Sequence, residues 1–353
     1  MTSHHRRRSA LWLGLLATAA VFTLGGPGGA GQAADPPAQA FPTGFRPIDP
    51  YLQVDAMRRG INILGYDPAW KGGAPRFQAS HFTIIRQGGF DTIRVNLEAF
   101  SHMDADNRLD PAWLKRLDWV VDTATKAGLT VILDEHNFND CGKDPQACRP
   151  RLLAFWKQVG ERYRDTPNTV VFELLNEPNS GLTANLWNGL MHDALAVVRT
   201  TNPTRNVIVG PAHWNSLDDL QYLYLPADDH HLIVTFHYYT PMEFTHQGAS
   251  WNEATAHMSG VQWGSTADLT RMDADFNRVQ LWARQHHRPI LLGEFGAYDK
   301  GEMVYRARYT AAAARGAEAR GWAWAYWQFD SDFIVWDMAK DQWVEPIHKA
   351  LVP

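Results

Sequence analysis

The stretch Thr169-Val-Val-Phe-Glu-Leu-Leu-Asn-Glu-Pro178 decides the fold, because it joins a nearly continuous apolar run to two polar residues and a proline. A second stretch, Pro289-Ile-Leu-Leu-Gly-Glu-Phe-Gly296, is built in the same way. Apolar runs of this kind are typical of parallel strands that are buried on both faces. We therefore expect Glu177 and Glu294 at the carboxyl ends of two buried strands, where parallel α/β folds carry their chemistry.

Short β-like runs alternate with amphipathic helical patterns from Gly60 onward. Asp110 and Pro111, for example, fit the cap and the first position of a helix that Gly128 ends. Its apolar face holds Leu114, Leu117, Val121 and Ala124. We expect eight strands, at residues 60–64, 92–96, 130–134, 169–175, 206–210, 232–236, 290–294 and 322–327.

The spacing between these strands leaves room for a crossover helix each time, as parallel pairing requires. Eight strands alternating with helices predict an α/β fold, a (β/α)8 TIM barrel formed by a single domain at residues 59–353. The alternative is an open doubly wound sheet, which should show a glycine-rich phosphate turn after its first strand. Gly60-Ile-Asn-Ile-Leu-Gly65 does not match that turn.

The N-terminus has the pattern of an export signal. Arg6-Arg7-Arg8 precede an apolar run at residues 10–24 and a small-residue segment at 31–34, which predicts a signal peptide over residues 1–34. The consecutive arginines also permit twin-arginine export, and an uncleaved anchor is the alternative. Residues 35–58 begin with a proline-rich stretch that lacks periodicity, and they are predicted to form an extended arm. We expect a secreted or periplasmic protein that is free of the membrane after cleavage.

Composition excludes several classes of function. The 353-residue chain has a net charge of -5, which becomes -8 without the three arginines of residues 1–34, so a nucleic-acid partner is not expected. Hydrophobic residues make up 45%, as in a soluble globular protein with a large core. Cys141 and Cys148 are predicted to form a local disulfide, with a metal clip as the alternative. We expect a monomer that needs no cofactor and no metal.

Polar side chains lie at or just after the ends of most of the predicted strands, at positions where they would not contribute to an apolar core. They are Arg94, His136, Asn176, Glu177, His237, Tyr239 and Glu294, with Trp327 at the last strand. In a barrel they would all face one mouth. Two carboxyl groups, directed polar partners and tryptophan platforms suit glycoside hydrolysis, in which one carboxylic acid protonates the leaving oxygen and a second carboxylate attacks or activates water.

Six segments in order resemble glycoside hydrolase family 5: Asp91-Thr-Ile-Arg-Val-Asn-Leu97, Leu133-Asp-Glu-His-Asn137, Leu175-Asn-Glu-Pro178, Phe236-His-Tyr-Tyr239, Gly293-Glu-Phe-Gly296 and Tyr326-Trp327. The resemblance implies a retaining mechanism with Glu177 as acid/base and Glu294 as nucleophile. Arg94 beside Glu294 would keep it ionised, and Tyr239 would donate a hydrogen bond to it. Asn176 would hold the sugar 2-hydroxyl, and His136 and His237 would orient the sugar and the acid/base. Trp327 would form the floor of the subsite in which the ring distorts.

The segment His237-Tyr-Tyr-Thr-Pro-Met-Glu-Phe-Thr-His-Gln-Gly248 resembles bacterial endo-β-1,4-glucanases, or cellulases, and implies a β-glucan substrate. Mannan, xyloglucan and mixed-linkage glucan are the alternatives, and transglycosylation is open. Three loop tryptophans are candidate platforms for further sugar units: Trp214, Trp251 and Trp263. Many relatives have Ser-Gly-Phe-Gly after the last strand, whereas this chain has Ser331-Asp-Phe-Ile334, so Asp332 or Trp336 could alter a glycone subsite or belong to the loop alone.

Two other classes of protein are the alternatives to a glycoside hydrolase. A metal-dependent barrel hydrolase would use His136, His213 and His237, but their spacing lacks a ligand motif. A sugar-binding barrel without catalysis would be marked by the loss of one glutamate, and both are present.

Overall fold

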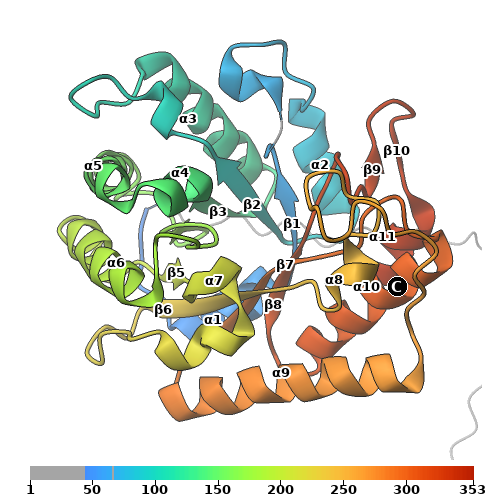
Figure 1. The fold of residues 1–353 in the computed structure, drawn as a ribbon. Helices are drawn as coiled ribbons and strands as arrows, with labels where there is room; N and C mark the ends of the chain where they lie inside the picture. The colour runs from blue at the N-terminus through green and yellow to red at the C-terminus, as the bar shows by residue number, and fades with distance from the viewer. Residues whose placement is uncertain (1–43, 66) are drawn as a thin grey trace, which may run out of the picture. The chain divides into compact units, whose positions relative to one another are not determined.

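Eight parallel strands close into a barrel in a computed structural model that describes residues 44–65 and 67–353. Each strand pairs with its neighbours in chain order, and β1 pairs with β8 (Figure 1). The strands are β1 Arg59–Ile63, β2 Thr92–Leu97, β3 Thr130–Glu135, β4 Val170–Glu173, β5 Val207–Val209, β6 Leu232–Tyr238, β7 Ile290–Phe295 and β8 Ala323–Tyr326. The predicted barrel is confirmed, and the doubly wound sheet is excluded. The predicted signal peptide lies outside the described residues.

The longer helices surround the strands on the outside of the barrel, and short helices lie in the connecting loops (Figure 1). They are α2 Ala79–Gln87, α3 Pro111–Lys126, α4 Phe138–Lys143, α5 Pro145–Arg162, α6 Ala184–Arg199, α7 Ala212–Asn215, α8 Met242–Thr245, α9 Thr266–His286, α10 Met303–Glu318 and α11 Glu345–Leu351, with 3-10 turns η1 Pro68–Lys71, η2 Phe100–His102 and η3 Leu217–Tyr222. A small antiparallel pair, β9 Trp336–Asp337 and β10 Gln342–Trp343, follows the barrel. No helix among the described residues is long and apolar enough to cross a membrane.

Helix α3 has the predicted start, because the Asp110 carboxylate accepts a hydrogen bond from the amide of Ala112 at 2.7 Å and Pro111 is the first helical residue. Its buried face includes the predicted Leu117, and Trp113 is buried in place of the partly exposed Leu114.

An eight-residue helix, α1 (Pro50–Met57), precedes the barrel, so the predicted extended arm is wrong at these positions. Asp49 caps the helix, and Val54 and Met57 are buried. These two side chains pack against residues near the amino ends of the strands: Ile132, Val171, Ile208, Ile233, Leu291 and Ala323. The helix therefore closes the end of the barrel opposite the glutamates. Its short length hides the apolar periodicity that reveals a longer helix.

The predicted disulfide between Cys141 and Cys148 is present. It joins α4 to the first turns of α5, and both cysteines are buried. The segment that follows β3 is therefore fastened to the helix beside it.

Candidate active site

The two glutamates meet at the carboxyl ends of the strands. Glu294 lies in β7, and Glu177 lies in the loop after β4, where it adopts a left-handed φ of 40°. A carboxylate oxygen of each and a ring nitrogen of His237 all lie within 4.8 Å of one another. Residues that are 117 positions apart in the chain thus share one small volume.

An irregularity in the sheet aligns His237 with Glu294. The pairing of β6 with β7 runs in register up to Phe236 and Leu292, then shifts by one residue so that His237 lies opposite Glu294. Gly293 is the residue passed over, and a Cβ atom there would lie 2.4 Å from the hydroxyl oxygen of Thr235. Only glycine fits at this point, so the shift is built into the sequence.

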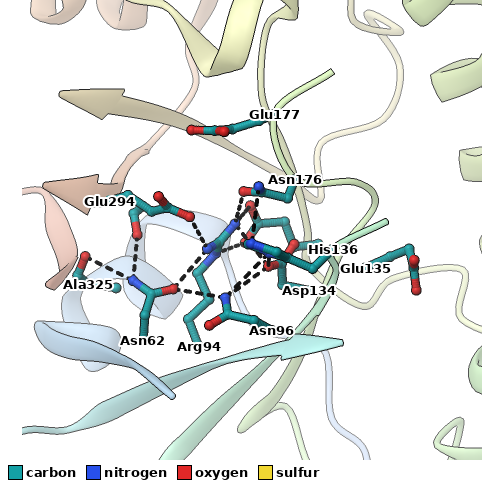
Figure 2. Close-up of polar contacts among 12 residues, drawn as sticks. Asn62, Arg94, Asn96, Asp134, Glu135, His136, Asn176, Glu177, Glu294 and Ala325 are labelled. Atoms are coloured by element: carbon teal, nitrogen blue, oxygen red, sulfur yellow. Dashed lines mark hydrogen bonds and ion pairs between the residues drawn. The ribbon is translucent and has the colours of Figure 1, made fainter. Parts of the chain in front are cut away.

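Arg94 projects from β2 into the barrel and is fully buried. Its guanidinium donates to Glu173 through Nε at 2.7 Å and Nη2 at 2.9 Å, and to Glu294 through Nη1 at 2.8 Å. The amide oxygens of Asn62 and Asn176 each accept from it at 2.8 Å (Figure 2). A buried guanidinium is stable only when its donors are satisfied, and here several elements of the barrel supply the acceptors.

Two donors contact the carboxyl group of Glu294 from different sides. Arg94 contacts one of its carboxylate oxygens, and the Tyr239 hydroxyl donates to the other at 3.0 Å. Burial first, and then the charge of Glu294, raise the pKa of Tyr239 well above its usual value, so this hydroxyl keeps its proton. Both contacts leave Glu294 as the acceptor, which suits an ionised carboxylate.

Four residues of this network were not among the predicted site residues: Asn62, Asn96, Asp134 and Glu173. Asp134 lies 3.1 Å from Arg94 and bonds to His136, and Asn96 bridges Asn62 and Asp134. The sequence does contain one indication of these residues, because each is a charged or amide residue inside an otherwise apolar strand. Glu173, within the apolar run at residues 169–175, is an example. The neighbouring Glu135 points away from this cluster (Figure 2), and burial raises its pKa well above the usual value.

Glu177 has a different environment from Glu294. Its Oε1 lies 2.7 Å from Nδ1 of His237, and no guanidinium among the described residues forms an ion pair with it. Burial raises the pKa of Glu177 to about 7, against the opposing charges of His136 and Arg94. Burial also lowers the pKa of His237 to about 3, so the imidazole is neutral at neutral pH. Glu177 can therefore hold a proton under conditions in which an ordinary glutamate has lost it.

His136 and Asn176 lie beside each other in the same cluster. His136 Nδ1 lies 2.6 Å from Asp134, and although burial opposes it, this carboxylate raises the pKa of His136. Its ring stacks on Trp327 with a centroid distance of 5.7 Å and an interplanar angle of 6°. Because Asn176 gives its oxygen to Arg94, its amide nitrogen is the end that faces His136, at 3.4 Å.

The three loop tryptophans that were predicted as sugar platforms differ in their exposure to solvent. Trp214 and Trp251 are 49% and 54% exposed, as a sugar platform requires. Trp263 is only 2% exposed and packs between Phe244 and Tyr309, so its prediction as a platform is wrong. Its loop folds back onto α10, a contact that sequence does not reveal.

In the loop after β8, the structure decides between the two alternatives for Trp336. Trp336 is buried and stacks on Phe329 with ring centroids 5.8 Å apart, so it belongs to the packing of the loop and does not line the rim. Asp332 adopts a left-handed φ of 52°, and its carbonyl accepts a hydrogen bond from the amide of Asp299.

Among the described residues, one group of three side chains could hold a metal ion: Glu177, His237 and Glu294. The histidine set of the metal-dependent alternative is not brought together there, because His213 pairs with Asp219 and His136 pairs with Asp134. The positive charge of Arg94 on Glu294 works against a cation at the same place.

Comparison with known proteins identifies the family of this barrel. A family model described as cellulase, glycosyl hydrolase family 5, matches residues 54–332. Endoglucanase H of Acetivibrio thermocellus is 27% identical over 303 residues, which is 82% of this chain and 32% of that protein. Structures of Thermotoga maritima Cel5A with cellobiose and with mannotriose are each 36% identical, with a TM-score of 0.83, and the match covers 86% of this chain and 100% of theirs.

The chain spans about a third of the length of the first curated relatives, 32% of Endoglucanase H and 37% of the cellulase/esterase CelE from the same organism. The match nevertheless runs through the barrel, from α1 to the loop after β8, and includes every strand that carries a side chain of the site. The chain belongs to glycosyl hydrolase family 5, the cellulase family.

Proposed function

We propose that this protein is a retaining endo-β-1,4-glucanase that cleaves β-glucan chains by double displacement. The observation that carries the proposal is the close approach of two carboxyl groups, with oxygens within 4.8 Å, in two different environments. Retaining glycosidases hold their carboxyl groups about 5 to 5.5 Å apart, whereas inverting enzymes need about 6.5 to 9.5 Å to admit a water.

In the first step, the Glu294 carboxylate attacks the anomeric carbon while Glu177 gives its proton to the glycosidic oxygen. The bond between that carbon and oxygen breaks, the leaving sugar departs as an alcohol, and an ester joins Glu294 to the remaining sugar. In the second step, Glu177 as a carboxylate takes a proton from water, whose oxygen displaces Glu294 from the anomeric carbon. Two inversions give net retention of configuration.

The division of roles follows from the contacts. Arg94 and Tyr239 stabilise Glu294 as an anion, whereas burial lets Glu177 keep its proton near neutral pH. Asn176, held through its oxygen by Arg94, would donate from its amide nitrogen to the sugar 2-hydroxyl. The exposed Trp214 and Trp251 would contact further sugar units, and Trp327, although only 7% exposed, is the proposed floor of the subsite in which the ring distorts.

Azide rescue tests the roles of the two glutamates separately. Glu294→Ala should lose turnover and, with azide and an activated β-cellobioside, give the α-glycosyl azide, because azide attacks directly. Glu177→Ala should give the β-azide, because azide then opens the ester on Glu294. Unchanged turnover in Glu294→Ala, or the β-azide from that variant, would refute the assignment.

The names of the relatives support a β-glucan substrate. Endoglucanase H and other relatives are named for glucan cleavage, and Cel5A has been solved with cellobiose. The same protein has been solved with mannotriose, which makes mannan the second candidate. Activity on carboxymethyl cellulose, mannan, xyloglucan and mixed-linkage glucan, with products followed over time, separates these polysaccharides and detects transglycosylation. Strong activity on mannan and none on carboxymethyl cellulose would reverse the choice.

Further expectations accompany this proposal. The protein should act as a monomer after export to the periplasm or the medium, and it should need no metal. Activity should be unchanged in a chelator, and a chelator-sensitive enzyme would favour a metal-dependent reaction instead. Sizing of the exported protein, together with its N-terminal sequence, tests the monomer and the cleavage of residues 1–34.

A further inference from the structure

Asn215, at the end of α7, contacts the side of His237 that faces away from Glu177. Its amide nitrogen lies 3.2 Å from Nε2 of His237, and both side chains are buried. An amide nitrogen can only donate, so Nε2 accepts and the single proton of the neutral ring lies on Nδ1. Nδ1 is the atom 2.7 Å from Oε1 of Glu177.

This tautomer decides which oxygen of Glu177 carries the acidic proton. Oε1 is already an acceptor, so a proton there would point at the N–H of His237. The proton therefore belongs on Oε2. In the other tautomer, the bare Nδ1 would accept the proton of Glu177 and hold it away from a substrate.

The backbone that presents Asn215 is strained. His213, Trp214 and Asn215 have φ values of 52°, 58° and 54°, three successive residues in the left-handed region. Each such residue costs about 1 to 2 kcal/mol for a non-glycine side chain, although asparagine tolerates the region better than most. Strain of this kind persists only where surrounding contacts fix it, and it gathers at functional sites.

Contacts on three sides fix the turn. His213 pairs with Asp219, and the amide of Trp214 donates at 3.2 Å to the carbonyl of Pro178, the residue after Glu177. Gly210 leaves the space for the Asn215 amide, because a Cβ atom at position 210 would lie 2.2 Å from Oδ1. The turn therefore contacts the loop of Glu177 and the partner of Glu177 at once.

We propose that the left-handed turn His213–Asn215 positions the acid/base, with Asn215 fixing the tautomer of His237 and so directing the proton of Glu177 to Oε2. Asn215 is a positioning residue, because it acts only through His237. The inference rests on the proposed function, since it assumes that Glu177 is the acid.

The test compares two substrates that differ in their need for an acid. Cellotetraose requires protonation of a poor leaving group, whereas 2,4-dinitrophenyl β-cellobioside releases a phenolate that needs no proton. Asn215→Gly deletes the amide and suits the left-handed backbone. It should lower kcat/KM on cellotetraose by about tenfold or more, a fraction of the effect of a general acid, and change kcat/KM on the aryl cellobioside by less than about twofold. Asn107→Gly, also at a left-handed position but in the loop between η2 and α3, is the matched control and should change neither.

A second variant perturbs the side-chain amide of Asn215 through a neighbouring residue. Gly210→Ala should displace Asn215 and reproduce the selective loss while the asparagine remains. The 15N shifts of His237 should report the Nδ1–H tautomer in the wild type and a mixture in both variants. Equal losses on both substrates, no loss on either, or an unchanged tautomer would overturn the inference. Inactivity of the wild type on cellotetraose, or full activity of Glu177→Ala there, would instead overturn the proposed function.

Discussion

Glu177→Gln should stabilise the protein at alkaline pH and leave its stability unchanged in acid. Burial raises the pKa of Glu177 from 4.5 to about 7, so the folded state disfavours its charged form. Below pH 4.5 the carboxyl is protonated in both the folded and unfolded states. As the pH rises toward 7, the unfolded chain ionises first, and the wild type loses stability until the folded group ionises too.

The size of the effect follows from the shift. A shift of about 2.5 pKa units corresponds to about 3 kcal/mol at 1.36 kcal/mol per unit, and the whole of it is lost above pH 8. Glutamine has the same shape, carries no charge and can still accept the hydrogen bond from His237. The variant should therefore exceed the wild type by about 3 kcal/mol at pH 8.5, or roughly 6 °C in Tm.

Thermal unfolding of both proteins at pH 4.5 and pH 8.5 measures this difference, and Glu253→Gln, at an exposed position, is the control. The same group should set the alkaline limb of kcat/KM in the wild type near pH 7, because the acid must be protonated. An equal Tm difference at both pH values would refute the reasoning, since it would show that the charge of Glu177 is not what the fold disfavours.

Three further changes test the scaffold. Met57→Ala should lower the free energy of unfolding in urea by about 3 kcal/mol, because it opens a cavity at the closed end of the barrel. Its kcat/KM should be unchanged, and a lower kcat/KM would contradict the placement of Met57 at the end of the barrel opposite the site. Arg205→Met should lower the free energy of unfolding by about 3 kcal/mol, because the buried guanidinium donates hydrogen bonds to five backbone carbonyl oxygens. A smaller loss in urea unfolding would mean that water replaces the guanidinium as the donor. Cys141→Ser should cost about 2.5 kcal/mol, and reductant should lower the Tm of the wild type but not of the variant.

The barrel could be predicted because its elements carry local signs. Each strand is a short apolar run, and Asp110 with Pro111 marks a helix start that the structure reproduces. The ends of elements were less predictable, since β6 continues through Tyr238 and β4 stops at Glu173. Those ends depend on pairing with neighbouring strands, which sequence alone does not specify.

The sequence did not predict those site residues whose hydrogen-bond and ion-pair partners are set by tertiary contacts. The sequence places Arg94 near an anion, but closure of the barrel brings Glu173 and Asp134 against it as well. Asn215 carries no local sign of its role, because its side chain reaches His237 only through three successive left-handed residues. A buried tryptophan such as Trp263 and an exposed one such as Trp251 look alike until the loop folds.

His237 lies between the two carboxyl groups, with Nδ1 at 2.7 Å from Glu177 and 3.5 Å from Glu294. In the first step of the proposed reaction, the negative charge leaves Glu294 as the ester forms and appears on Glu177 as its proton departs. A neutral Nδ1–H can strengthen its bond to Glu177 as that charge arrives, without movement of the ring. A protonated imidazole would instead favour the carboxylate form of Glu177 from the start and remove the acid. Burial, which lowers the pKa of His237 to about 3, therefore protects the proton that the leaving group needs.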